Sequence, residues 1–142
     1  AIPGIRSRIF PAISYIDSHY PQEVSTEQLA NLCSMTQTQL NASFRKAFDK
    51  TPLQYLRQVR IRKACSLLDR TEDSTLSIAY ASGFSSISSF NRSFQELLGK
   101  TPAAFRNERR AIRKKQLHYA PYSSDSSFTA SVSDTEPDCH PD

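Results

Sequence analysis

The sequence has 142 residues, of which 38% are hydrophobic and 23% are charged, and its formal net charge is +4. This length suits one domain or two very small ones, and this composition suits a globular chain with a polar appendage. The sequence contains no apolar run long enough to cross a bilayer, so we expect no membrane contact from this segment.

Residues that serve enzymes and metal sites are sparse. The only glycines are Gly4, Gly83 and Gly99, which excludes a glycine-rich phosphate loop. The three histidines have no nucleophile or carboxylate partner at a motif spacing. Cys139 and His140 are adjacent, but two neighbouring residues do not make a four-ligand metal site. We therefore expect no enzyme activity, no cofactor and no metal.

The charge is distributed unevenly. Residues 1–115 carry all 18 Lys and Arg with 9 Asp and Glu, whereas residues 116–142 carry no Lys or Arg and 5 Asp and Glu. A basic body indicates a polyanionic partner. The acidic, Ser-rich stretch 116–142 shows no periodicity and is predicted to be a disordered tail.

Two stretches of the chain repeat each other, residues 29–52 and residues 78–102. The copies are in register at an offset of 49 before a central turn and of 50 after it. Two copies are too few for a solenoid. The repeat therefore indicates one functional unit that is used twice.

Hydrophobic periodicity and capping residues predict a series of helices after a short lead-in at residues 1–7. Pro11 is expected in the first turn of the first predicted helix (8–20), and Leu53 is expected on the apolar side of the fourth predicted helix (52–69). A short helix, a tight turn and a longer helix make a helix-turn-helix unit, expected at 26–48 and again at 75–98. The predicted helices span residues 8–20, 26–33, 37–48, 52–69, 75–82, 85 or 86 to 98, and 102–115.

The second helix of each unit has polar residues between its buried apolar ones. Short donors and acceptors beside long cations suit the reading of base edges in a major groove. The same pattern also fits the polar outer face of a helical protein–protein interaction module, which is the alternative function. Because DNA binding through phosphates weakens steeply with salt, salt dependence distinguishes the two.

With these units in view, residues 8–110 resemble the C-terminal DNA-binding domain of the AraC/XylS family of bacterial transcription regulators. The stretches that carry the resemblance in the first unit are Leu29-Ala30, Met35, Leu40, Phe44-Arg45-Lys46, Phe48 and Thr51-Pro52. Those of the second unit are Ile78-Ala79, Gly83-Phe84, Phe90, Arg92, Phe94 and Gly99-Lys100-Thr101-Pro102.

The resemblance implies an all-α fold over residues 8–115, a seven-helix bundle of two helix-turn-helix subdomains joined by a long linker helix (52–69). Both recognition helices would enter successive major-groove segments on one face of double-stranded DNA. A linker near 25 Å, from about seventeen residues at 1.5 Å each, is compatible with a helical turn of about 34 Å.

The resemblance also implies a transcriptional activator of the bacterial cytoplasm, at the nucleoid, with RNA polymerase as a second partner. A ligand-sensing or dimerising domain would precede these residues in the parent chain, and a start at Ala1 is consistent with a separated C-terminal piece.

Site residues follow from the resemblance by position. Arg92 suits guanine, and Asn41 and Asn91 suit adenine. Two positions depart from the family: Ala42 replaces a long polar residue, and Glu96 would repel phosphate and weaken the second unit. The implied base-facing residues are Thr38, Asn41, Ala42, Ile87, Ser88, Asn91 and Arg92. The implied backbone contacts are Gln37, Arg45 and Lys46.

Overall fold

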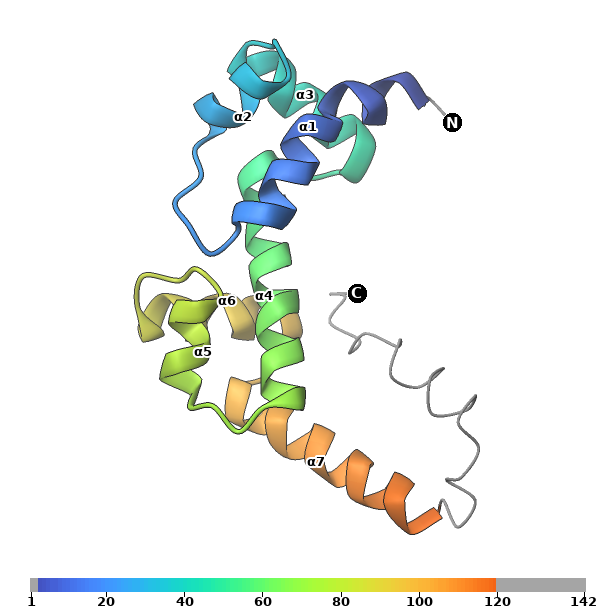
Figure 1. Cartoon of the computed structure of the whole chain (residues 1–142), viewed down its shortest axis with the longest axis vertical. Coiled ribbons are helices and arrows are strands. Elements are labelled where there is room, and N and C mark those ends of the chain that lie inside the picture. The colour runs from blue at the N-terminus through green and yellow to red at the C-terminus, as the bar shows by residue number, and fades with distance from the viewer. Residues whose placement is uncertain (1–2, 120–142) are drawn as a thin grey trace.

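The fold consists of two helical subdomains stacked along one shared helix. A computed structural model of the chain describes residues 3–119, which form seven helices and no strand, so the predicted all-α architecture is confirmed (Figure 1). The helices are α1 (Pro3–His19), α2 (Thr26–Leu32), α3 (Gln37–Phe48), α4 (Pro52–Arg70), α5 (Thr75–Ala81), α6 (Ile87–Leu98) and α7 (Pro102–Tyr119).

Side-chain caps fix where the inner helices begin. In α2, the Ser25 hydroxyl accepts a hydrogen bond from the Gln28 amide at 3.1 Å, and the Gln28 side chain accepts one from the Ser25 amide at 2.9 Å. This capping box satisfies two backbone donors at once, and α3 and α4 begin with the same Thr-x-x-Gln arrangement. Ser86 caps α6, its hydroxyl accepting a hydrogen bond from the Ser89 amide.

Helix α1 differs from its prediction at its start. The expected lead-in at residues 1–7 is helical from Pro3, and Pro11 lies inside the helix instead of in its first turn. The earlier start has a packing cause, since the Arg6 guanidinium lies 5.2 Å from the centre of the Phe48 ring. Pro11 has no N–H to donate, and α1 bends along its length (Figure 1).

The other helix ends differ by fewer residues. Helix α4 continues to Arg70, one residue beyond its predicted end. Helix α7 continues from the predicted end at residue 115 to Tyr119, through residues with good helix propensity. The tail predicted to be disordered, 116–142, is therefore helical over its first four residues, and the remainder lies outside the described residues.

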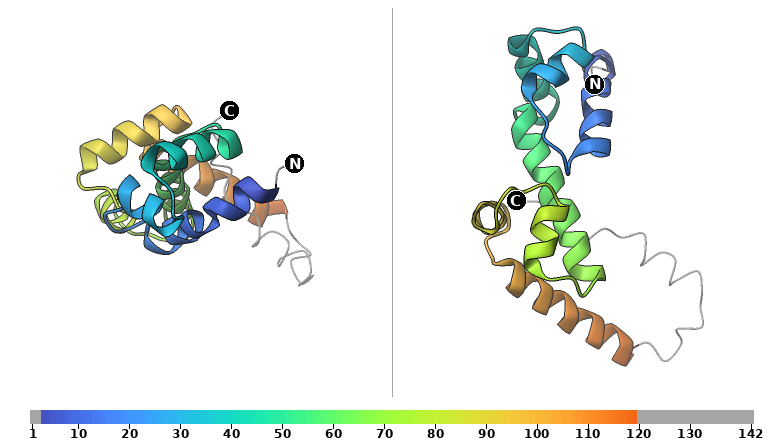
Figure 2. Two further views of the ribbon diagram at one scale, coloured as in Figure 1. Left: turned by 90° about the horizontal axis from the view of Figure 1, so that it is seen from above. Right: turned by 60° about the vertical axis from the view of Figure 1, so that its left-hand side comes forward.

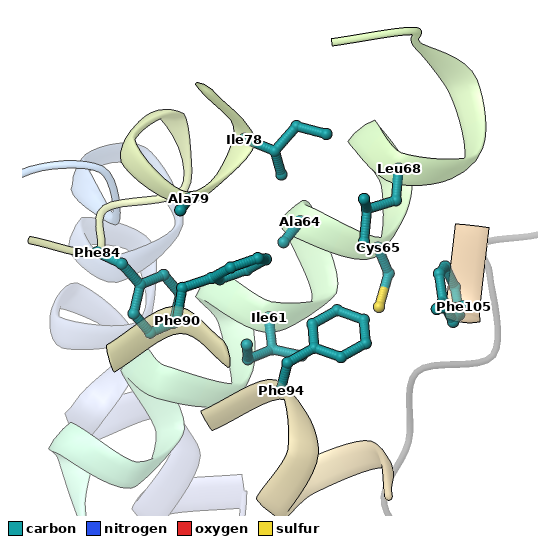
Figure 3. Close-up of a cluster of buried hydrophobic side chains, with 10 residues drawn as sticks. All are labelled: Ile61, Ala64, Cys65, Leu68, Ile78, Ala79, Phe84, Phe90, Phe94 and Phe105. Atoms are coloured by element: carbon teal, nitrogen blue, oxygen red, sulfur yellow. The ribbon is translucent and has the colours of Figure 1, made fainter. Parts of the chain in front are cut away.

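Helix α4 belongs to both hydrophobic cores. Its residues Leu56 and Val59 are buried in the first core, beneath α1, α2 and α3. Its residues Ile61 and Leu68 are buried in the second core, beneath α5, α6 and α7 (Figure 3). Leu53, which was predicted on the apolar side, is 48% exposed. The buried face of α4 changes direction between the two cores, so one apolar stripe does not describe it.

Aromatic rings occupy the centre of each core. In the second core, Phe90 and Phe94 are fully buried and lie edge to face, with ring centroids 5.7 Å apart. Phe84 lies 5.3 Å from Phe90, and Phe105 of α7 lies 5.7 Å from Phe94. The chain of four rings joins α6 to α7 and to the turn before α6 (Figure 3).

Helix α7 is attached to the end of α4 by its arginines. Arg106 donates to the backbone carbonyls of Leu68 and Thr71, each at 3.1 Å. Arg113 pairs with Asp69 at 2.6 Å, and Arg110 pairs with Glu72. These cations hold the helix in place.

Removal of a central ring should loosen the second subdomain. We expect Phe94→Ala to lower the free energy of unfolding by about 3–5 kcal/mol, because it leaves a cavity among buried rings. Urea denaturation followed by circular dichroism measures this change. Phe10→Ala is the matched control, since Phe10 is 62% exposed and its loss should cost little. Equal effects of the two substitutions would contradict the core assignment.

Ser82 offers a second test of packing. Its hydroxyl is fully buried and has no hydrogen-bond partner among residues 3–119. Burial of an unpaired hydroxyl is costly, so Ser82→Ala should leave stability unchanged or raise it by about 1 kcal/mol. Ser93 is also buried but accepts a hydrogen bond from Arg57, so Ser93→Ala should be destabilising. Destabilisation by Ser82→Ala in the same urea assay would show that its hydroxyl has a partner.

Candidate nucleic-acid interface

The two helix-turn-helix units share one turn geometry. In the first turn Ser34 has φ 55° and the Met35 amide donates to the Ala30 carbonyl at 2.9 Å. In the second turn Gly83 has φ 101° and the Phe84 amide donates to the Ala79 carbonyl at 3.0 Å. These residues are related by the offset of 49 seen in the sequence. The repeat therefore corresponds to a structural duplication.

Helix α3 presents one polar face to solvent. Its core side is fixed by Leu40 and Phe44, which are fully buried. Thr38 and Ala42 are exposed, and Asn41 between them is half-buried. These three residues lie at helical spacings of three and four, on one face. The residues predicted to contact the DNA backbone are also exposed: Gln37, Arg45 and Lys46.

Helix α6 has the same construction with different outward residues. Ser88, Asn91 and Arg92 are exposed, and Arg92 makes no hydrogen bond or ion pair with the residues that the structure describes. Ile87 is half-buried and packs against the second core, so part of this predicted base-facing side chain is structural. Ile87, Asn91 and Arg92 also line one open groove, together with residues from the first turns of α5 and α7.

The two recognition helices face the same way. Seen from above, in the left view of Figure 2, α3 and α6 lie on the same side of α4 and run in similar directions. Helix α1 and helix α7 lie toward the opposite side in this view. The two helices that carry the residues predicted to read bases therefore lie on one side of α4.

Several cations near α6 are not available to a ligand. Arg57 of α4 donates to the Ser93 hydroxyl at 3.1 Å and forms an ion pair with Glu96. Glu96 was expected to repel phosphate, but Arg57 offsets its charge. Arg60 donates to the carbonyls of Tyr20 and Gln22, and burial lowers the pKa of its guanidinium.

Sequence reasoning missed these partners, because Arg57 lies 36 residues before Ser93 and 39 residues before Glu96. Helical periodicity reports which face a residue occupies, but it does not report what a distant segment brings to that face.

Metal ligands do not gather within the described part of the chain. Among residues 3–119, His, Cys, Asp and Glu form no group of three that could hold a metal ion. Cys139 and His140 lie outside that part. Nor is any helix among these residues long and apolar enough to cross a membrane.

Comparisons with known proteins agree with this geometry. A helix-turn-helix domain family matches residues 29–108. The HTH-type transcriptional activator RhaS of Enterobacter sp. (strain 638) is 30% identical over 105 residues, which cover 74% of this chain and 38% of the relative. The uncharacterized HTH-type regulator YdeC of Bacillus subtilis (strain 168) is 28% identical over 99 residues, 70% of this chain and 34% of YdeC. The chain thus spans about a third of the length of these relatives.

Two solved structures share the fold over nearly their whole length. The DNA-binding domain of AdpA, solved in complex with a target DNA, has a TM-score of 0.71 and 28% identity. An AraC-type regulator from Chromobacterium violaceum has a TM-score of 0.70 and 26% identity. Each likeness covers 75% of this chain and 96% of the other. The duplicated turns, the shared orientation of α3 and α6 and these matches establish that the chain belongs to the AraC/XylS family of DNA-binding transcription regulators.

Proposed function

We propose that the chain reads double-stranded DNA with both subdomains, α3 and α6 entering successive major-groove segments on one DNA face, and thereby regulates transcription. The observation that carries the proposal is the display of α3 and α6 on one side of α4 (Figure 2). An α-helix fits a B-DNA major groove, and successive segments on one face lie about 34 Å apart. The related domain of AdpA was solved with a target DNA, which supports DNA binding by this fold.

In the first unit, α3 reads bases with short side chains. Thr38 and Asn41 donate and accept hydrogen bonds at base edges, and Asn41 suits adenine. Ala42 offers a methyl group, which can contact the methyl of thymine. Around this face, Gln37, Arg45 and Lys46 contact phosphates, which positions the helix without reading sequence.

In the second unit, Arg92 is the main specificity residue. Its exposed guanidinium can pair with O6 and N7 of one guanine, while Asn91 suits adenine. Ser88 and the exposed part of Ile87 complete this face. Because the two faces differ, the proposed site is asymmetric and not a palindrome.

The parent protein acts in the bacterial cytoplasm, at the nucleoid, as an activator that contacts RNA polymerase. A domain N-terminal to these residues senses a ligand or dimerises. The support is the name of one relative, a transcriptional activator, and the share of the relatives' length that this chain leaves uncovered.

Selection of bound duplexes from a random pool at physiological salt tests the proposal. We expect a motif with two boxes about one helical turn apart. We also expect affinity for the selected duplex to fall with salt, at a slope of about −0.9 per phosphate contact on logarithmic axes. A single box would remove one unit from the proposal. No selected motif together with a flat salt dependence would favour the protein–protein interaction module.

Substitution of Arg92 tests its assigned base contact. Arg92→Ala should weaken binding of the selected duplex by about 1–3 kcal/mol and relax preference at one base pair. Arg45→Ala, at a predicted phosphate contact, is the matched control and should weaken all sequences by a similar factor. Fluorescence anisotropy with duplexes changed one base pair at a time measures both. A uniform loss for Arg92→Ala would make Arg92 a phosphate contact instead.

A further inference from the structure

The junction between the two subdomains contains a half-buried arginine from α4, Arg60. Arg60 donates from Nε to the Tyr20 carbonyl and from Nη2 to the Gln22 carbonyl, each at 2.7 Å. Both carbonyls belong to the segment that joins α1 to α2 in the first subdomain. Arg60 thus ties this segment to α4 at the level where the second subdomain begins.

Gly83, in the turn of the second unit, lies directly against the same segment. A Cβ on Gly83 would overlap the Tyr20 carbonyl oxygen and would lie 2.7 Å from Nε of Arg60. The φ of Gly83 also favours glycine, because 101° lies beyond the left-handed region of about 50–70° that holds Ser34, the equivalent residue of the first unit, at φ 55°. The backbone conformation and the close approach of the two subdomains therefore both exclude a side chain at residue 83.

A third contact joins α4 to the recognition helix α6 across the junction. Arg57 follows Leu56, which is buried in the first core, yet its guanidinium reaches Ser93 and Glu96 of α6. The remaining space is a cleft of about 620 Å³, lined on one side by residues 21–24 and on the other by Ser85 and Ser89. Few contacts besides α4 itself therefore fix the angle between the subdomains.

We propose that Arg57 and Gly83 are positioning residues, which hold α3 and α6 at one separation and so determine the spacing between the two DNA segments that the chain accepts. The DNA part of this inference rests on the proposed function. A continuous helix with one subdomain on each half can bend or twist, and a second contact away from the helix axis removes this freedom. Glycine at residue 83 sets how close the subdomains come, and the Arg57 contact limits how far they pivot.

The first test is made without DNA. Residual dipolar couplings of the isotopically labelled chain report whether the two subdomains share one alignment tensor. We expect one tensor for the unmodified chain and two different ones for Arg57→Gln, whereas Gly83→Ala should rotate one subdomain relative to the other. Exposed ion pairs add little stability, so the Arg57 variant should stay folded.

Each variant has a matched control within the second subdomain. Arg110→Gln breaks an exposed Arg–Glu pair that does not cross the junction. Gly99→Ala places a side chain at φ 72°, where a Cβ meets nothing within 4 Å. Both controls should keep one tensor and the unmodified orientation. Couplings that do not differ between variants and controls would overturn the positioning role.

The second test uses the duplex selected from the random pool, with its two boxes separated by one, two or five additional base pairs. Five base pairs are about half a helical turn and place the second box on the opposite DNA face. We expect the unmodified chain and both controls to lose affinity about tenfold or more with two added base pairs, about a fifth of a turn. Arg57→Gln should flatten this dependence, and Gly83→Ala should move its optimum.

The results distinguish failure of the positioning role from failure of the proposed function. Suppose that a two-box duplex is selected and that the affinity of both variants depends on box separation as in the unmodified chain. This result would overturn the inference and leave the proposed function intact. If no two-box duplex is selected, the proposed function fails, and the spacing role fails with it even where the couplings change.

Discussion

The burial of one helix in two cores is the constraint on which the rest of the structure depends. Within the described residues, α4 contacts α1 and α3 on its first half and α5, α6 and α7 on its second. Leu56 and Val59 are nearly fully buried in one core, and Ile61 and Leu68 in the other. Because a helix rises 1.5 Å per residue, the positions of these side chains along α4 set how far apart the two subdomains lie. Both recognition helices inherit their placement from it.

The sequence predicted the features that depend on interactions between residues close together in the chain. Caps and periodicity act over three to seven residues, so α3 was predicted with its observed bounds. The internal repeat indicated the two units, and the family resemblance added the expectation that both enter one face of DNA. The early start of α1 depends on Arg6 reaching Phe48, a contact between distant segments that no local pattern contains. The base and phosphate contacts stay predictions, although the exposure of Thr38, Ser88 and Arg92 is compatible with them.

The two copies of the helix-turn-helix unit differ in which residue occupies each position of left-handed backbone. Asp49 ends α3 at φ 58°, and Gly99 ends α6 at φ 72°, so either residue type serves where space is open. At the turns the pair is Ser34 and Gly83, and there the second subdomain lies against the first. Gly83 differs from the other three residues in its larger φ of 101° and in the overlap that a Cβ would make with the Tyr20 carbonyl oxygen. Both features require glycine at residue 83.

The arginines show why net charge overstates what a basic chain offers to DNA. Arg57 and Arg110 are paired with Glu96 and Glu72, and Arg60 and Arg106 donate to backbone carbonyls. The paired ones add little to the field, and the others keep their charge while their guanidinium groups are engaged by carbonyls. In the proposed function these four arginines do not contact phosphate, so binding would depend on the remaining cations and on base contacts by α3 and α6. A fixed separation between α3 and α6 would then matter to binding in addition to the total charge.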